Sequence, residues 1–297
     1  MSSNEDLRAD WNPLDRSVAR AADALRDSEV GSPDALLLLA TGPGDLPARM
    51  TDSVVVPLRE VPGVPAAWHG VTLRAGRLGD ALVWLIEDDA DLEHGPEPDW
   101  NRAFPVWLAG AAGARLMIHT SAGTALGSTS PDGATLVAGD VVRLVDHLNL
   151  SGRSPLRGLG ESRLGPLFPD QTRVHDERLG ELAWDAAKRR GLDLTNGIVA
   201  CTSGPALCTP AELAWHKTAG CDVSVQRLGD PLIAAAHAGM ACLALVAITD
   251  VAGEDDLDVA AIVARAEHTA PVLDQLVDDV ARQVGPIARE RAAEVEA

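Results

Sequence analysis

Short apolar runs alternate with amphipathic helical segments along most of this 297-residue chain. Most of the apolar runs end in glycine, proline or small polar residues, as buried strands do. We expect strands at residues 35–40, 54–58, 71–75, 81–86, 115–120, 141–145, 197–201, 221–225 and 241–248. We expect helices at residues 14–25, 101–112, 174–190, 210–219, 231–239 and 257–283. This alternation predicts an α/β fold with a central mixed sheet flanked by helices. One domain is expected over residues 1–297, with flexible tails at 1–12 and 287–297.

Small and polar residues follow several of the expected strands, at the strand ends where α/β folds place their ligands. Thr41 opens a glycine-containing loop after the first strand, and the sequence Ser-Ala-Gly-Thr follows another strand at 121–124. Such loops let backbone N–H groups approach an anion, although a tight strand-to-helix turn also explains the Thr41 loop. Residues 202–205 and the pair at 249–250 follow two later strands in the same way.

The charge of the chain limits its partners. It has 25 Lys and Arg against 44 Asp and Glu, a formal net charge of −19. This balance opposes binding to nucleic acid or to an anionic membrane surface. The four cysteines form no Cys-x-x-Cys pair, and no apolar run reaches the ~18 residues that span a bilayer. The chain does not start with a basic and apolar leader, so we expect a reduced, cytoplasmic protein.

The segment 140–169 is the hardest to explain as generic fold. It starts as a strand at 141–145, and Asp146, His147 and Asn149 follow where that strand should end. The remainder is an irregular stretch rich in Gly, Pro, Ser and Arg. Connections of this length in compact domains are either functional or disordered. Its large apolar side chains argue against disorder.

Four motifs stand in this segment: Asp-His-Leu-Asn-Leu at 146–150, Gly152, Pro-Leu-Arg-Gly at 155–158 and Gly-Pro-Leu-Phe-Pro at 165–169. In order and spacing they resemble the signature of the trimeric purine nucleoside and methylthioadenosine phosphorylases. The resemblance covers about residues 36–276 and implies a single α/β sandwich around a distorted sheet barrel. It also implies cleavage of the N-glycosidic bond of a purine-type nucleoside, with phosphate as a co-substrate and no cofactor. A homotrimer is expected, in which Leu164 replaces the family's aromatic residue that covers the ribose of a neighbouring site.

Several positions keep the chemistry that the resemblance implies. Thr41 matches the hydroxyl that contacts phosphate, while Ser121 and Ala122 lie at the family's Asn-Ala-Ala-Gly turn. Asp250 matches the Asn or Asp that hydrogen-bonds the purine edge, and it is the catalytic candidate. A carboxylate accepts hydrogen bonds from N–H, so Asp250 favours a base with a 6-amino group. Plainer explanations are a turn residue for Thr41 and a helix cap for Asp250.

The expected phosphate site is altered. Asp89, Asp91 and Glu93 stand where the family has an Arg, a His and a Tyr. Like charges repel, so this acidic loop opposes ordinary phosphate binding. Its spacing faintly resembles a calcium loop, but His94 and Trp100 occupy the positions of the turn glycine and the closing carboxylate. We therefore favour a solvated acidic loop and expect no metal.

The expected base site is altered too. Cys208 stands at the end of the motif that supplies the family's base-binding carboxylate, and Gln226 and Arg227 replace a Met and a hydroxyl residue. No histidine is placed in sequence to activate Cys208, so packing explains it better than nucleophilic catalysis. The guanidinium of Arg227 could bind phosphate beside Thr41, or it could pair with Asp89 or Asp91 and close the pocket; we favour the pairing. The family's histidine at the last helix has no clear match, and His268 is expected on a helix surface.

Two functions stay open at this point. The first is cleavage of a nucleoside by a phosphorylase-like glycosyltransferase, with phosphate or water as the acceptor. The second is a catalytically inactive relative that binds a nucleoside-like ligand or serves as an assembly partner.

Overall fold

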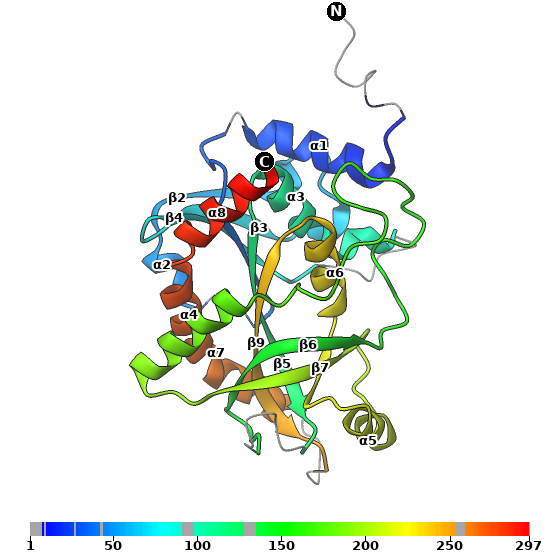
Figure 1. Cartoon of the computed structure of the whole chain (residues 1–297), viewed down its shortest axis with the longest axis vertical. Coiled ribbons are helices and arrows are strands. Elements are labelled where there is room, and N and C mark those ends of the chain that lie inside the picture. Colours follow the sequence, from blue (N-terminus) through cyan, green and yellow to red (C-terminus); the bar gives the residue numbers. More distant parts are fainter. Residues whose placement is uncertain are drawn as a thin grey trace, which may run out of the picture.

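A mixed sheet of nine strands, in the order β2-β3-β4-β1-β5-β8-β7-β6-β9, runs through the protein (Figure 1). The chain is seen in a computed structural model that describes residues 8, 10–26, 28–41, 44–90, 98–127, 135–253 and 259–296. The strands are β1 (Ala35–Leu39), β2 (Thr51–Pro57), β3 (Thr72–Leu78), β4 (Ala81–Glu87), β5 (Leu116–Ala125), β6 (Val141–Asn149), β7 (Leu194–Thr202), β8 (Val223–Gln226) and β9 (Ala241–Val251). The α-helices are α1 (Pro13–Arg26), α2 (Leu46–Arg49), α3 (Phe104–Ala112), α4 (Glu177–Arg190), α5 (Pro210–Thr218), α6 (Gly229–His237), α7 (Val259–Ala281) and α8 (Gly285–Glu296). Short 3₁₀ helices are η2 (Leu58–Glu60), η3 (Ala66–Trp68) and η4 (Asp99–Ala103). The expected α/β fold is confirmed.

Part of the sheet closes on itself. β5 pairs with β8 at its C-terminal end and with β9 along its whole length, and β9 also pairs with β6. The strands β5, β8, β7, β6 and β9 therefore form a ring, which is the distorted barrel that the resemblance implies. At Gly123 on β5, a Cβ would overlap the side chain of Val225 and the carbonyl oxygen of Ser224 on β8. Glycine is required here because the two strands approach so closely.

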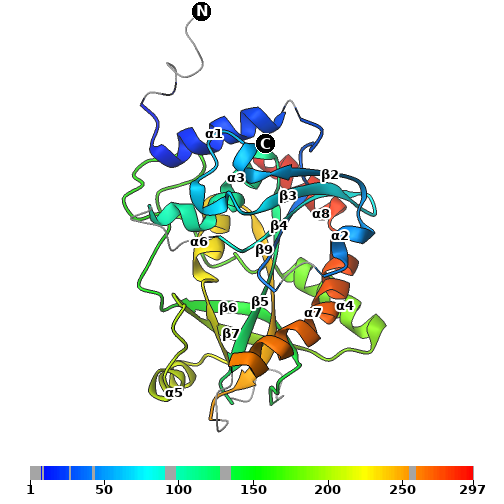
Figure 2. The same ribbon diagram turned by 180° about the vertical axis from the view of Figure 1, so that it is seen from behind.

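Helices cover the two faces of the sheet with separate cores (Figure 2). On β1, Leu36 and Leu38 face a core shared with α1, α3 and α6, whereas Leu37 and Leu39 face a core shared with α4, α7 and α8. Successive side chains of a strand point to opposite faces, so a continuous apolar run suits a strand that is covered on both sides. This explains why the run at 35–39 contains no polar residue.

The parallel register brings the C-terminal ends of β1 and β4 beside the middle of β5. Leu39 of β1 lies opposite Glu87 of β4 and Thr120 of β5. The backbone N–H of Asp88 donates to Leu39 O, and that of Ala40 donates to Thr120 O. The residues that follow these strands therefore meet at one edge of the sheet.

Three strands are longer than expected. β6 continues to Asn149, β5 to Ala125 and β9 to Val251, so the predicted polar exits at 146–149, 121–124 and 249–250 lie within strands. Ring closure is the reason, because these residues pair with neighbouring strands, as Asn149 does with Cys201. A polar residue in a closed ring keeps its backbone partners, so polarity is a poor marker of where such a strand ends.

The expected flexible tails are largely structured where they are described. Residues 285–296 form α8, in which Ile287 packs on the core and Arg291 forms a 2.6 Å ion pair with Asp176. Near the start of the chain, Asn12 Nδ2 donates to Glu161 O at 2.7 Å. Residues 1–7 and 9 of the predicted N-terminal tail lie outside the described residues.

The irregular segment that carries the signature motifs is anchored to the helices. The carboxylate of Asp15 on α1 accepts hydrogen bonds from Ser162 Oγ at 2.7 Å and from the N–H of Arg163 at 2.8 Å. At Gly165 a Cβ would overlap the carbonyl oxygen of His237, at the end of α6. The segment is therefore ordered by specific contacts, as its apolar side chains suggested.

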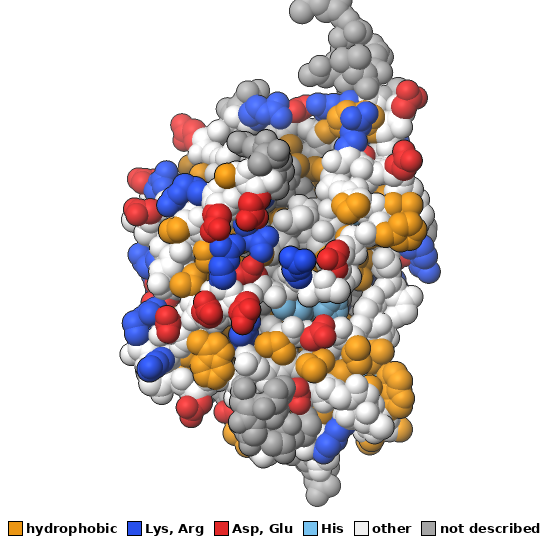
Figure 3. Space-filling view, in the orientation of Figure 1, with side chains coloured by type: hydrophobic (Ala, Val, Ile, Leu, Met, Phe, Trp, Pro, Cys, Tyr) orange, Lys and Arg blue, Asp and Glu red, His pale blue; other side chains and the backbone are white. Residues whose placement is uncertain are grey.

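The surface mixes charges of both signs. Acidic and basic side chains are interspersed over the face shown in Figure 3, with apolar side chains between them. Among the described helices, none is both long and apolar enough to span a bilayer.

Candidate active site

The first part of the site lies where β1 and β4 end beside Thr120 in the middle of β5. Thr41 Oγ1 donates to Thr120 Oγ1 at 2.9 Å. The loop that begins at Thr41 is held from α7, because the buried carboxylate of Asp274 accepts a hydrogen bond from Asp45 N–H at 3.0 Å. Burial raises the pKa of Asp274 to about 6. Ser121 is buried in β5 directly after Thr120.

A buried pair of ionisable groups lies beside this edge. His119 Nε2 and Asp88 Oδ2 are 3.1 Å apart, and both side chains are more than nine-tenths buried. Within the described residues, His119 Nδ1 has no hydrogen-bond partner. Sequence reasoning missed this pair, because His119 reads as part of a buried strand and Asp88 as part of an acidic loop.

Behind the edge, a cavity of about 200 Å³ brings together residues from five separate segments. Its lining is Ala122, Gly123, Thr124, Leu207, Cys208, Leu213, Ser224, Gln226, Thr249, Asp250 and Ile262. Four of the predicted site residues are among them, namely Ala122, Cys208, Gln226 and Asp250. A largely apolar wall with a few polar groups is the usual form of a small-molecule site.

Asp250 supplies the charge of this cavity. It is 5% exposed, and its Oδ1 accepts a hydrogen bond from Thr249 Oγ1 at 2.7 Å. Arg265 on α7 donates to Thr249 O at 2.8 Å, which ties the helix to the end of β9. The second carboxylate oxygen, Oδ2, is the one left for a ligand.

The wall opposite is set by the loop after β7. Cys208 Sγ lies 3.7 Å from Ser224 Oγ, and Gln226 Nε2 donates to Ala206 O at 3.1 Å. At Gly204 a Cβ would approach Gln226 Oε1 to 2.5 Å, so the loop and the Gln226 side chain fit each other closely. The thiol and the hydroxyl can each donate or accept a hydrogen bond, unlike the carboxylate that the family has here.

Arg227 does not line the cavity at Asp250. It has a left-handed backbone, with φ of 64°, and its guanidinium donates to Ala90 O at 3.3 Å. Among the described residues it forms no ion pair with Asp89, in contrast to one of the two pairings that we expected. The alternative partner, Asp91, lies outside the described residues together with Glu93. The side chain of Arg227 nevertheless contacts the acidic loop, at the backbone oxygen of Ala90.

Further arginines converge near the start of α6, a feature that sequence reasoning missed. Arg157 donates to Asp99 Oδ2 with two nitrogens, at 2.7 and 3.0 Å, and Arg153 lies 3.7 Å from Asp99 Oδ1. Arg102, on η4, is half-buried, and burial followed by the positive charge of Arg153 lowers its pKa. We call Arg102, Arg153, Arg157 and Arg227 the arginine cluster. Arg157 and Arg227 lie at motif positions, but no motif marks Arg102 or Arg153 in the sequence.

Asp230 faces the arginine cluster from the first turn of α6. It is 9% exposed, and burial raises its pKa to about 6 even though Arg102 acts in the opposite direction. Its Oδ1 is buried and lacks a hydrogen-bond partner in the described structure. A buried carboxylate oxygen without a partner is costly, so this atom indicates either a bound ligand or a bound proton.

Three other predicted residues lie elsewhere. Leu164 is half-buried against the protein's own core, His268 is exposed on α7 as expected, and His147 Nδ1 lies 3.1 Å from His175 Nε2. No group of three or more His, Cys, Asp or Glu side chains within the described ranges could hold a metal ion.

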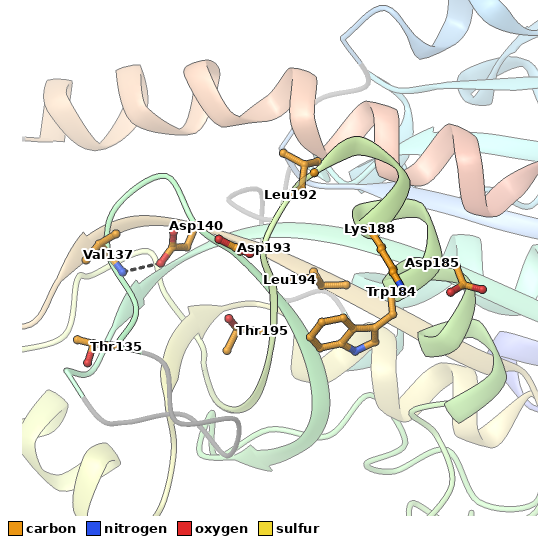
Figure 4. Close-up of a pocket in the computed structure, with 11 residues that line it drawn as sticks. Thr135, Val137, Asp140, Trp184, Asp185, Lys188, Leu192, Asp193, Leu194 and Thr195 are labelled. Carbon is orange, nitrogen blue, oxygen red and sulfur yellow. Dashed lines mark hydrogen bonds between the residues drawn. The ribbon is translucent and has the colours of Figure 1, made fainter.

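A larger hollow, of about 770 Å³, lies between α4 and the start of β7 (Figure 4). Trp184 and Lys188 come from α4, Asp193 directly precedes β7, Thr195 lies at its start, and Asp140 comes from the turn before β6. Its lining shares no residue with the cavity at Asp250. The cavity at Asp250 is the better candidate site although it is smaller, because polar side chains from several segments converge on it.

Comparison with known proteins places the chain in a family. Residues 34–282 match the model of the Phosphorylase superfamily. The chain belongs to this superfamily, and within it to the purine nucleoside phosphorylase family as a divergent member.

Two relatives define that placement. The purine nucleoside phosphorylase 1 of Geobacillus stearothermophilus is 30% identical over 239 residues, which cover 80% of this chain and 85% of the relative. The purine nucleoside phosphorylase of Mycobacterium tuberculosis is 32% identical over 276 residues, 90% of this chain and 96% of the relative. A purine nucleoside phosphorylase from Schistosoma mansoni, solved with cytosine and ribose-1-phosphate, has the same fold, with a TM-score of 0.82 at 22% identity over 90% of this chain and 96% of that one.

Proposed function

We propose that this protein cleaves the N-glycosidic bond of a purine-type nucleoside. The observation that carries the proposal is the cavity of about 200 Å³, which collects Ala122, Cys208, Gln226 and Asp250 from distant parts of the chain. The family resemblance in the sequence points to the same four positions. The close relatives bear the name purine nucleoside phosphorylase, which supports the same reaction class.

Asp250 has the chemistry that the departing base requires. When the glycosidic bond breaks, the base leaves with the bonding electron pair and takes up a proton on a ring nitrogen. A carboxylate that accepts hydrogen bonds from base N–H groups stabilises that protonated form. Because Asp250 is buried, water competes little for these hydrogen bonds. A 6-aminopurine nucleoside is therefore the preferred substrate class.

The acceptor end of the site differs from that of the family. Thr41 stands at the edge where an acceptor would approach, but Asp88 and Asp89 lie at the same edge. Negative charge at close range disfavours a phosphate dianion, which supports an altered phosphate site with weak binding at neutral pH. Water then becomes a competing acceptor.

An exposed aromatic residue supports a homotrimer. Phe168, in the signature segment, is 87% exposed, and the neighbouring Leu167 is 47% exposed. Adjacent large apolar side chains left open to water mark interaction surfaces. We propose that this part of the signature segment packs against the next protomer, close to Leu164, whose side chain the protomer only half buries.

The acid-rich acceptor end also favours a second candidate, a catalytically inactive relative that binds a nucleoside-like ligand. One assay separates the two. Purified protein is incubated with adenosine or inosine, with and without phosphate, and free base and sugar products are quantified by chromatography. Base release that Asp250→Ala abolishes supports the enzyme, with ribose 1-phosphate reporting phosphorolysis and free ribose reporting hydrolysis. Nucleoside binding without base release supports the inactive relative.

A further inference from the structure

The charged groups that act on Asp230 lie on several neighbouring segments. Arg102 and Asp99 lie on η4, which packs against α6, and Arg153 lies on the signature segment. Asp88 follows β4, where it is paired with His119 of β5. Behind Asp230 is the Cys201 thiol of β7, whose pKa is strongly raised by burial, with a smaller contribution from the carboxylate.

Arg102 is the member of the arginine cluster with unused binding capacity. Arg153 and Arg157 share Asp99, and Arg227 donates to Ala90 O. Arg102 forms no hydrogen bond or ion pair with any described residue, although it lies close enough to Asp230, Arg153 and Arg227 for their charges to affect its pKa. A half-buried guanidinium with free N–H groups is suited to a bidentate oxyanion.

We propose that Arg102 and Arg227 bind the anionic acceptor, inorganic phosphate, and that the buried carboxyl of Asp230 makes this binding depend on pH. This inference rests on the proposed function and names the residues that hold its acceptor. The cations lost from the loop after β4 are replaced from η4 and from the end of β8.

The charge state of Asp230 sets the sign of the pH dependence. When it is ionised, Asp230 compensates Arg102 and repels an incoming anion. When it is protonated, its O–H becomes a donor, the negative charge near Arg102 is removed, and the cluster gains one unit of positive charge. The pKa of Asp230 is about 6, so anion affinity is low at neutral pH and increases as the pH falls through that value. The weak phosphate binding proposed above is the neutral-pH side of this equilibrium.

Sulfate is the probe of choice, because phosphate changes its own charge near neutral pH whereas sulfate remains a dianion. Its affinity is measured by isothermal titration calorimetry on the full chain at about pH 7.5 and about pH 5.5. If only the protonated form of Asp230 binds, affinity increases by up to about 25-fold between the two conditions, in proportion to the protonated fraction.

Three variants test the assignment. Asp230→Asn keeps a neutral donor at every pH, so it binds sulfate tightly at both pH values and loses the pH dependence. Arg102→Gln weakens binding at both, by 10-fold or more. Arg178→Gln is the matched control, because Arg178 pairs only with Glu290 on the surface among described residues and lies outside the cluster. It binds sulfate as the wild type does. Phosphate titrations at the higher pH then show whether Asp230→Asn also restores affinity for the acceptor.

The wild-type protein gives an independent measurement that needs no substitution. Sulfate titrations near pH 6.5 in two buffers of different ionisation enthalpy report the protons taken up on binding, and we expect uptake of a fraction of one proton. Zero uptake, an unchanged affinity in Arg102→Gln, or a wild-type pH profile in Asp230→Asn would overturn the proposal. These titrations contain no nucleoside. Failure of the anion site therefore leaves base release to be judged separately, and failure of base release leaves the anion site intact.

Discussion

Replacing Asp250 by asparagine should reverse the preference of the site between 6-amino and 6-oxo purines. In the wild type, Thr249 Oγ1 donates to Asp250 Oδ1 at 2.7 Å, which leaves Oδ2 as the acceptor for a base N–H. If the same hydroxyl continues to donate to Oδ1 of asparagine, the amide presents its NH₂ group at the position of Oδ2. A donor then replaces an acceptor on a side chain that is 5% exposed, where water cannot make up for a mismatch.

The size of the change follows from the strength of hydrogen bonds to charged groups, about 1.5–3 kcal/mol each. Loss of that interaction lowers the selectivity for adenosine over inosine by roughly 10- to 150-fold. The assay is the ratio of kcat/KM for the two nucleosides in competition, or the ratio of their binding constants if turnover is absent. Asp185→Asn, an exposed change of the same kind on α4, serves as the control. An unchanged ratio in a folded Asp250→Asn protein would refute the assignment of Asp250 to the base.

Three further predictions concern the scaffold around the site. Gly165→Ala should lower the free energy of unfolding by about 1–3 kcal/mol or more, because the new methyl group meets a backbone carbonyl at the end of α6. Thermal unfolding should show a lower midpoint temperature for this variant. Gly70→Ala is the control and should keep the wild-type midpoint, because a Cβ there meets no atom within 4 Å. Phe168→Asp should convert a trimer into monomers in light scattering, and a trimer that persists at micromolar concentration would place the interface elsewhere. The pKa of His175 is lowered to about 4 by burial, with a smaller contribution from His147. The folded state therefore binds fewer protons than the unfolded state below about pH 6.5. The free energy of unfolding should decrease as the pH falls from about 6.5, by up to ~3 kcal/mol near pH 4. Urea unfolding across that range should show the loss in the wild type and a flatter profile in His175→Gln.

The sequence is most informative where one local pattern decides the structure. The apolar run of β1 and the alternation of strands and helices predict the fold, because burial on both faces leaves a direct mark on composition. The base cavity could be predicted for a different reason. Ala122, Cys208 and Asp250 lie at positions that the signature resemblance locates, and the cavity brings them together.

Features that depend on tertiary pairing could not be predicted in the same way. Asp250 lies within β9, where we expected a strand end, because the ring of strands supplies backbone partners to polar residues. α8 has five charged residues among its twelve, and it is held by apolar contacts of Ile287 and Ala288 and by the ion pair between Arg291 and Asp176. Arg102 and Asp230 are far apart in the chain and belong to no motif, so only the packing of η4 on α6 places them together.

Substitutions act differently at the two ends of the proposed site, because these ends are built from different parts of the fold. The cavity at Asp250 is lined largely by strands of the ring, whose backbone pairing fixes each position, so a changed residue such as Gln226 of β8 stays in place and changes only the hydrogen bonds that it offers. The acceptor end is built from segments that leave the sheet, and charge can be moved from one segment to another without disturbing it. Acids at Asp88 and Asp89 therefore do not determine the potential there by themselves, because Arg102 and Arg227 enter the same region from other elements. In the proposed anion site, the balance between these charges depends on whether Asp230 is protonated, so we expect pH to decide whether phosphate competes with water as the acceptor.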